Sequence, residues 1–335
     1  MDGRPRAKGL VWLSAWLGLL FPLEALGGEW SAIAEQKVLY TDDVFQLSSA
    51  RRLALAEDPS QPTIVPIEKP SDVVWEPSVE LRRTSRSRMG NTQVSFKAQG
   101  FLFTDHSIFN HGNYRLQLTQ VLAPGTSLLL RYRYIPNLFL GSNVERRSGA
   151  SSLQEERVTS HIWRAQLERR LFDAWTLTVA TRFGLRRYDE FFAQRDTRFY
   201  TIGPHVDYAY SPNLTLSLGY QHERGLADGR GDTRLLDDVS YRQHFVSTGA
   251  DLRLTSTLSL GLQYAYRFKE FTSDLIGDLQ RGRHDQTHQG MGELRYGLTA
   301  ASTLTFGVQR TQRTSNVLSR EFRDTNVSFG VQHRF

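Results

Sequence analysis

The stretch "LLLRYRYI", residues 128 to 135, decides the fold class of this chain. Apolar and aromatic residues at the even positions alternate with Arg131 and Arg133. Side chains that alternate with period two point to opposite faces of a β-strand, whereas a helical face needs a period of 3.6. The stretch therefore predicts a strand with one apolar face and one polar face.

The same alternation returns in "LTLSLGYQ" (214–221), "LSLGLQYAYR" (258–267) and "NVSFGVQHRF" (326–335). Each segment has about ten residues, the length that a tilted strand needs to cross a bilayer. The chain is 39% hydrophobic and contains no cysteine, so neither a large apolar core nor disulfides explain how it is held together. We expect apolar faces that contact lipid and backbone groups that pair within a closed sheet.

Two kinds of connection alternate between these segments, and they set the architecture. Short turns occupy 122–127, 171–176, 210–215, 254–259 and 298–303. Longer charged connections centre on 105–112, 137–156, 188–197, 224–237, 269–285 and 312–322. Short turns on one rim and long loops on the other are typical of a transmembrane antiparallel up-and-down β-barrel, with turns in the periplasm and loops outside. A soluble sandwich or barrel is the alternative, but it buries its apolar face and uses shorter strands.

Counting strands back from residue 335 gives twelve, the first of them at 93–103. Two further candidates lie upstream, at 72–83 and, more weakly, around 35–43. Fourteen strands keep the number even and both strand termini in the periplasm, so we favour fourteen. The alternative is twelve strands, with residues 28–90 as a periplasmic extension or a plug. Four prolines make 46–71 a long loop in either case.

The beginning of the chain has the pattern of an export signal. Arg4, Arg6 and Lys8 precede an apolar run over residues 10–21, and small residues follow at Ala25 and Gly27. A short apolar run with this charge and these small residues is typical of a secretory signal peptide. We predict a signal peptide over residues 1–27 and an outer-membrane barrel over 28–335, hence the cell outer membrane of a Gram-negative bacterium.

Aromatic residues on the apolar faces fall near strand ends, where amphipathic rings collect at the headgroup level. High β propensity would also place aromatic residues in strands, so only their position at the ends indicates a girdle. The residues concerned are Tyr134, Trp163, Trp175, Tyr208, Tyr210, Tyr220, Tyr266 and Phe335.

The polar faces carry more basic than acidic residues. Because an ionised side chain facing lipid at mid-depth costs about 2 to 4 kcal/mol, we expect these bases to face the interior of the barrel. The residues predicted to line the pore are Lys97, Arg115, Arg131, Arg133, Arg164, Arg182, Arg253, Arg267 and Arg295. A basic lumen favours a water-filled pore that passes small anionic solutes. The alternative is that the arginines pair with acids and stiffen a plugged lumen.

Catalytic and metal-binding patterns are weak. Ser160 and His161 are adjacent and point to opposite faces, whereas His205 and Asp207 share a face, for which a salt-bridging pair is the simpler interpretation. The sequence lacks G-x-S-x-G, H-E-x-x-H and cysteine-based metal motifs. The four aspartates of 226–238 suit a solvated loop better than a calcium site. We therefore expect no enzyme activity, no cofactor and no bound metal, and no nucleic-acid partner.

The segments "YTDDVFQLSS" (40–49) and "SDVVWEPSVELR" (71–82), followed by tandem hairpins and a terminal aromatic residue, resemble the outer-membrane β-barrel porins of Gram-negative bacteria. The family pattern has Asn where this chain has Asp43. The resemblance implies the location and the architecture but no particular cargo, and some members accompany polysaccharide export or secretion systems. A structural or export-associated barrel is thus the alternative to a porin, and an outer-membrane hydrolase is a weaker one.

The segment 326–335 keeps its alternation to Phe335. We expect this strand to close the barrel against the first one, because a frayed edge would leave unpaired backbone groups in lipid. Phe329, Val331 and Phe335 also resemble the signal by which the outer-membrane assembly machinery recognises its clients. The expected partners are therefore outer-membrane lipid, that machinery and an anionic solute.

Overall fold

A computed structural model describes residues 28–44, 71–87, 90–148, 152–317 and 321–335. The predicted signal peptide and nearly all of the predicted loop 46–71 lie outside the described residues. The described residues form fourteen strands: β1 (Gly28–Thr41), β2 (Asp72–Ser87), β3 (Gly90–Phe103), β4 (His111–Ala123), β5 (Thr126–Val144), β6 (Leu153–Arg170), β7 (Trp175–Tyr188), β8 (Thr197–Ser211), β9 (Leu214–Ala227), β10 (Tyr241–Arg253), β11 (Leu258–Phe271), β12 (His284–Gly297), β13 (Ser302–Ser315) and β14 (Phe322–Arg334). Two short 3₁₀ helices, η1 (Ser107–Phe109) and η2 (Glu190–Arg195), lie between strands.

No helix in the described ranges is long and apolar enough to cross a membrane.

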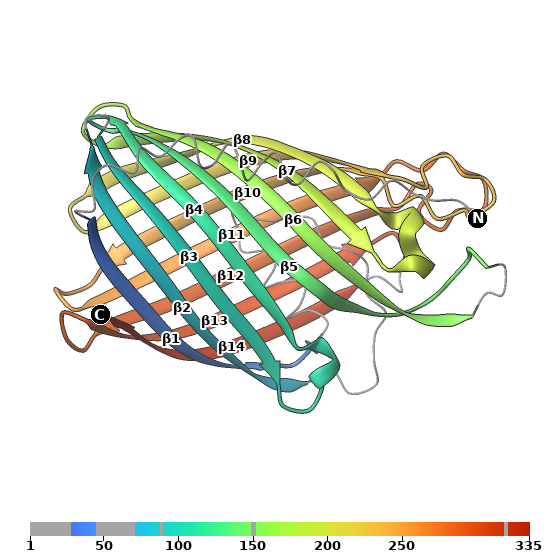
Figure 1. Cartoon of the computed structure of the whole chain (residues 1–335), viewed down its shortest axis with the longest axis horizontal. Coiled ribbons are helices and arrows are strands. Elements are labelled where there is room, and N and C mark those ends of the chain that lie inside the picture. The colour runs from blue at the N-terminus through green and yellow to red at the C-terminus, as the bar shows by residue number, and fades with distance from the viewer. Residues whose placement is uncertain (1–27, 45–70, 88–89, 149–151, 318–320) are drawn as a thin grey trace.

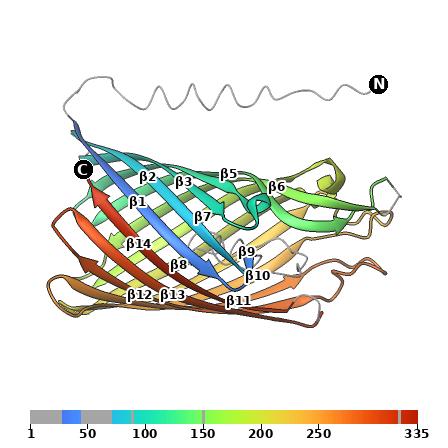
Figure 2. The same ribbon diagram turned by 90° about the horizontal axis from the view of Figure 1, so that it is seen from below.

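The strands form one closed antiparallel barrel in which each pairs with its neighbours in chain order (Figure 1). β1 lies beside β14, as Figure 2 shows from the blue and red strands, and their register runs from Ile33 opposite Arg334 to Thr41 opposite Asn326. Beyond the ladder, the Phe335 amide donates to the Ala32 carbonyl at 2.8 Å. The predicted barrel of fourteen strands is confirmed, and the twelve-strand alternative is wrong.

Strand boundaries differ from the sequence-based ones where the apolar signal is weak. β1 begins at Gly28 rather than near residue 35, because its outer face carries Ala32 and Ala34, which give little apolar contrast. β5 and β6 are also longer than predicted, with 19 and 18 residues, so most of the expected loop 137–156 is strand. Two register shifts, one beside Asn137 with φ of 47°, let β5 continue beyond the regular ladder.

Short turns and longer connections sit at opposite ends of the barrel, as the sequence predicts. In Figure 1 the short turns gather at the end that carries the C label, and η1 and η2 lie at the opposite end. Long connections on a barrel of this kind lie outside the cell, so η1 and η2 mark the extracellular rim.

The outward face of the strands is apolar and exposed. Leu218 is 61% exposed and Leu262 is 49% exposed, although both lie in mid-strand. Exposed apolar side chains in such numbers belong against lipid. The predicted girdle residues follow the same outward alternation, and Trp175 stacks on Tyr208 with ring centroids 4.4 Å apart near the periplasmic turns.

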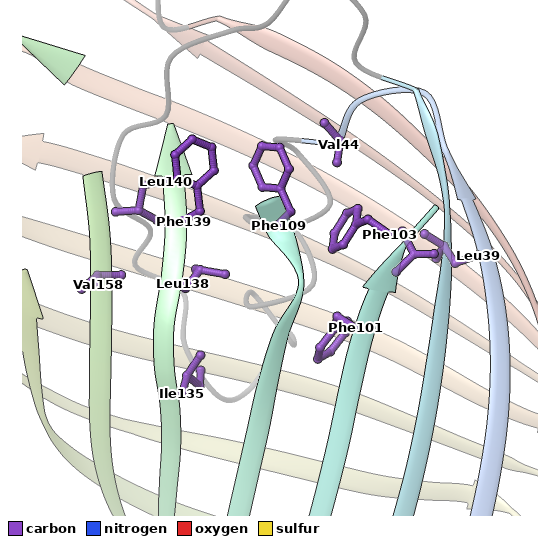
Figure 3. Packing of buried hydrophobic residues seen from close by; sticks show 11 residues of the cluster. Leu39, Val44, Phe101, Phe103, Phe109, Ile135, Leu138, Phe139, Leu140 and Val158 are labelled. Carbon is purple, nitrogen blue, oxygen red and sulfur yellow. The ribbon is translucent and has the colours of Figure 1, made fainter. Parts of the chain in front are cut away.

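A cluster of buried apolar residues lies on the inner side of the first six strands towards the extracellular rim (Figure 3). Phe109 of η1 packs edge-on against Phe139 of β5, with ring centroids 5.1 Å apart, and contacts Phe103 of β3 at 5.7 Å. The wholly polar inner face expected from the sequence is therefore wrong for this sector. The cluster comprises Leu39, Val44, Val74, Phe101, Phe103, Phe109, Ile135, Leu138, Phe139, Leu140 and Val158.

Candidate functional site

The candidate site is the inner wall of the barrel, whose side chains alternate with the exposed apolar ones. On β11, Tyr264 is 45% exposed on the outside, whereas Arg267 and Lys269 on the other face are 4% and 7% exposed. The period-two alternation of a strand thus separates lipid-facing from inward-facing side chains at each position.

The nine residues predicted to line the pore all occupy positions that alternate with outward apolar side chains. Three are buried, namely Arg133, Arg182 and Arg267, and Arg253, near a periplasmic turn, is exposed. The remaining five are half-buried: Lys97, Arg115, Arg131, Arg164 and Arg295.

Four of these nine residues pair with carboxylates across the wall. Lys97 lies 3.5 Å from Glu35, and Arg115 lies 3.2 Å from Glu80. Arg182 and Arg295 pair with Glu223 at 3.7 Å and Glu293 at 2.7 Å, respectively. The positive charge of these residues is offset locally. Sequence reasoning overlooked Glu35 and Glu223, although strand alternation places both on the inner face.

Four others are held by neutral groups. The partners are Gln117 for Arg131, Asn113 for Arg133, Gln166 for Arg164 and Thr287 for Arg267, at 2.9, 2.9, 2.7 and 3.0 Å. A neutral acceptor fixes the position of a guanidinium without itself adding a negative charge.

The strongest concentration of positive charge is a basic sector formed by Arg186, Arg267, Lys269, Arg283 and Arg313. Lys269 lies within electrostatic reach of three of these guanidiniums, those of Arg186, Arg267 and Arg283. Arg283 engages the Asp285 carboxylate through two hydrogen bonds of 3.0 and 2.6 Å. All five bases are at most 7% exposed. The residues come from β7, β11, the connection before β12, and β13.

Tyr241 of β10 organises this sector. Arg186 donates from Nη1 to its hydroxyl at 3.0 Å, and the hydroxyl donates to Glu223 Oε1 at 2.7 Å. The Lys269 ammonium lies 4.1 Å from the centre of its ring, a cation–π distance. A Cβ on Gly225 would lie only 2.2 Å from Tyr241 Cε1, so the glycine makes room for the ring. Nothing in the spacing of these residues along the chain indicates that they meet.

A cavity of about 460 Å³ lies in the periplasmic half of the inner wall, and His205, Asp207 and Arg164 line it together with Ser217 and Ser247. His205 Nε2 lies 3.1 Å from Asp207 Oδ1, as expected of the pair. No hydroxyl in the described part of the chain hydrogen-bonds to the His205 ring. The pair therefore lacks the oriented nucleophile that a hydrolase needs.

Three extracellular segments are joined by one arginine. Arg195 of η2 donates from Nε and Nη2 to Asp237 at 2.7 and 3.0 Å, and from Nη1 to Glu156 at 2.7 Å. We call this group the loop clamp. Asp237 lies between β9 and β10, and Glu156 lies near the start of β6. Both carboxylates are almost fully buried, at 5% and 1% exposure.

The charges of the loop clamp control the ionisation of its members outside the strands. Burial alone would raise the pKa of Asp237, but the adjacent Arg195 guanidinium outweighs burial and the pKa lies below its ordinary value. The two carboxylates in turn raise the pKa of Arg195 against the opposing effect of burial. Arg195 and Asp237 are thus both charged at neutral pH.

The four aspartates of the 226–238 loop do not converge on one point. Asp228 lies 3.6 Å from Arg198, Asp232 pairs with Arg234, and Asp238 accepts from the Ser240 amide. No group of side chains suited to a metal ion occurs among the residues that the structure describes. Asp237 and Asp238 are nonetheless buried, so the expectation of a solvated loop is wrong for this half of it.

The residues of the predicted assembly signal lie on the outside of the closing strand. Phe329, Val331 and Phe335 are 51%, 40% and 72% exposed. Their side chains face the lipid next to the seam between β14 and β1.

Residues 230–335, about the last third of the chain, match a family model described as "Putative beta-barrel porin 2". This matched region does not include the segments at 40–49 and 71–82 that suggested the resemblance. The likeness to outer-membrane porins is confirmed. The chain is similar to porin-like barrels of the outer membrane.

Several solved structures of outer-membrane proteins are similar to this barrel at low sequence identity. The outer membrane channel DcaP of Acinetobacter baumannii is 10% identical, with a TM-score of 0.51 over 92% of this chain and 97% of that chain. A bacterial polysaccharide outer membrane secretin is also 10% identical, with a TM-score of 0.50 over 90% and 98%. An anion-selective porin from Comamonas acidovorans is 11% identical, with a TM-score of 0.48 over 92% and 99%. A comparison with curated proteins finds no match.

Proposed function

We propose that this barrel is a passive, non-enzymatic channel that favours small anionic solutes. The supporting observation is the basic sector, in which five buried cations gather beside the carboxylates of Asp285 and Glu223. A concentration of fixed positive charge against a low-dielectric wall attracts anions and repels cations. Arg133 and Arg164, which donate to Asn113 and Gln166, add further positive charge along the wall.

The proposal has a direct electrical test. Purified protein in a planar bilayer with a potassium chloride gradient should give a reversal potential of the sign for chloride preference. Arg186→Gln combined with Arg267→Gln should move the reversal potential towards zero, because it removes two positive charges from the inner wall. Arg310→Gln is a suitable control, since Arg310 is an exposed arginine on the outer face of β13. A cation-selective or non-conducting wild-type barrel would contradict the proposal.

An export-associated barrel is the second candidate, and its support is the fold shared with the polysaccharide secretin. Such a barrel works with a periplasmic or surface partner, so a protein that co-purifies with it in stoichiometric amount would favour this candidate. Conductance without any partner would favour the channel.

A further inference from the structure

Four basic side chains, two arginines and two histidines, form a compact patch on the outer surface of the barrel, which faces lipid and not the lumen. Arg224 of β9 lies directly opposite Arg242 of β10. His222 lies directly opposite His244, and this second pair is two residues nearer the membrane centre on each strand. Both arginines are exposed. We call these four residues the outer patch.

The two arginines of the outer patch lack an internal counterion. Neither guanidinium has a hydrogen bond or an ion pair with any part of the chain that the structure describes. Glu270 lies opposite Arg242 on β11, but no ion pair joins them. Like charges directly opposite on paired strands destabilise a sheet. Glu270 offsets part of this repulsion on the β11 side of Arg242, and a bound anion would offset more of it beside Arg224.

The two histidine rings of the outer patch pack against each other beside the arginines. Their rings lie 4.9 Å apart, and the Tyr220 hydroxyl lies 2.8 Å from His244 Nδ1, which fixes that ring. Nδ1 of His222 is buried and has no hydrogen-bond partner among the described residues. Arg198 on β8, 57% exposed in its side chain, flanks the group, although Asp228 lies 3.6 Å from it.

Exposed apolar side chains lie immediately below the outer patch. Ile202 and Leu218 are 57% and 61% exposed, and Val246 is 40% exposed. Towards the extracellular end, β9 and β10 lead into the connection that bears Asp228 and Asp237. The outer patch thus lies where an apolar wall gives way to the extracellular rim, at the level of lipid headgroups.

We propose that the outer patch binds the phosphate group of an outer-leaflet lipid. Arginine pairs bind phosphate oxygens through bidentate hydrogen bonds, and the apolar side chains below would contact the acyl chains of the same molecule. A solute in the lumen cannot reach these side chains, because they lie on the opposite face of the strands. This site is independent of the channel proposed above.

The test compares lipids that share acyl chains but differ in headgroup. The full-length protein is reconstituted in phosphatidylcholine vesicles with or without phosphatidic acid, and retained lipid is counted by native mass spectrometry. Wild type should retain phosphatidic acid in preference to phosphatidylcholine. The double variant Arg224→Gln/Arg242→Gln should bind phosphatidic acid at least about tenfold more weakly than wild type. The reason is that the loss of one charge-assisted hydrogen bond weakens binding by about a factor of ten. Arg310→Gln should bind as wild type does.

The urea midpoint of unfolding provides a second readout. The effect of the variant on this midpoint should have opposite signs in vesicles with and without phosphatidic acid. In phosphatidylcholine alone, Arg224→Gln should raise the urea midpoint of unfolding, because it removes a repulsive pair. In vesicles with phosphatidic acid the same variant should lower the midpoint relative to wild type. The proposal would be overturned if the variant had the higher midpoint in both kinds of vesicle, or the lower midpoint in both. Equal retention of the two lipids by wild type would also overturn it. Displacement of phosphatidic acid by inorganic phosphate would overturn a lipid site in favour of a free-phosphate site.

Discussion

Replacing Arg195 with methionine should release the extracellular connections while leaving the barrel closed. The substitution removes three charge-assisted hydrogen bonds and leaves Glu156 and Asp237 buried without their cation. Breaking a buried ion pair in this way costs about 3 to 5 kcal/mol. The loss is confined to the rim, because the strand ladder below does not depend on these side chains.

Hydrogen exchange measured by mass spectrometry resolves this local effect. The amides of Asp228 and Gly229 donate to Asp196 and Gln194 at 2.8 and 2.7 Å, so they report on the contact between the two connections. A loss of about 3 to 5 kcal/mol corresponds to exchange faster by about two to four powers of ten. Peptides from mid-strand should exchange as in wild type.

A matched control lies in the same loop. Arg234 also makes two hydrogen bonds to one aspartate, Asp232, but its side chain is 86% exposed. Arg234→Met should leave exchange unchanged, because solvent screens such a pair. The reasoning is refuted if Arg195→Met accelerates exchange by less than tenfold, or if the two variants have equal effects.

The loop clamp also predicts a pH dependence. The pKa of Asp237 in the folded protein lies below its ordinary 3.8. The stabilisation it provides is therefore complete above about pH 4 and lost as the pH falls through the lowered pKa. Exchange at the Gly229 amide, corrected for its intrinsic pH dependence, should accelerate only in this acidic range. Acceleration between pH 5 and 7, where Arg195 and Asp237 are both charged, would contradict the assignment.

Three further outcomes can be checked with purified or membrane-inserted protein. Deleting Phe335 should sharply lower the amount of heat-modifiable, membrane-inserted barrel on gels, whereas unchanged assembly would exclude a role for it. Gly225→Ala should destabilise the barrel by about 1 to 3 kcal/mol in urea titrations, because its Cβ would meet the Tyr241 ring at 2.2 Å. Leu218→Arg on the lipid face should cost about 2 to 4 kcal/mol, while Ser217→Arg on the inner face should cost less; equal costs would mean the faces are misassigned.

Some features of the barrel follow from local pattern. Alternation in 258–267 and 326–335 fixes which side chains face lipid, because the period of a strand is two wherever it lies. Turn and loop lengths then fix the antiparallel order. Where the outer face carries small residues, as at Ala32 and Ala34, the pattern fades and the start of β1 was misplaced. Hydrogen-bond pairing with β14, a partner almost 300 residues away in sequence, defines this strand instead.

The sequence by itself determined that the chain is a transmembrane barrel and which face of each strand turns inward. Only the tertiary structure decided what those inward residues do. Closure and stagger bring Arg186 of β7 to Tyr241 of β10 and surround Lys269 with guanidiniums, yet they neutralise Arg115 with Glu80. They also bring Arg224 opposite Arg242 on the outside. The face to which a side chain points is set within a single strand. The pairing of charges depends on the register between neighbouring strands, which the period-two alternation of one strand does not encode.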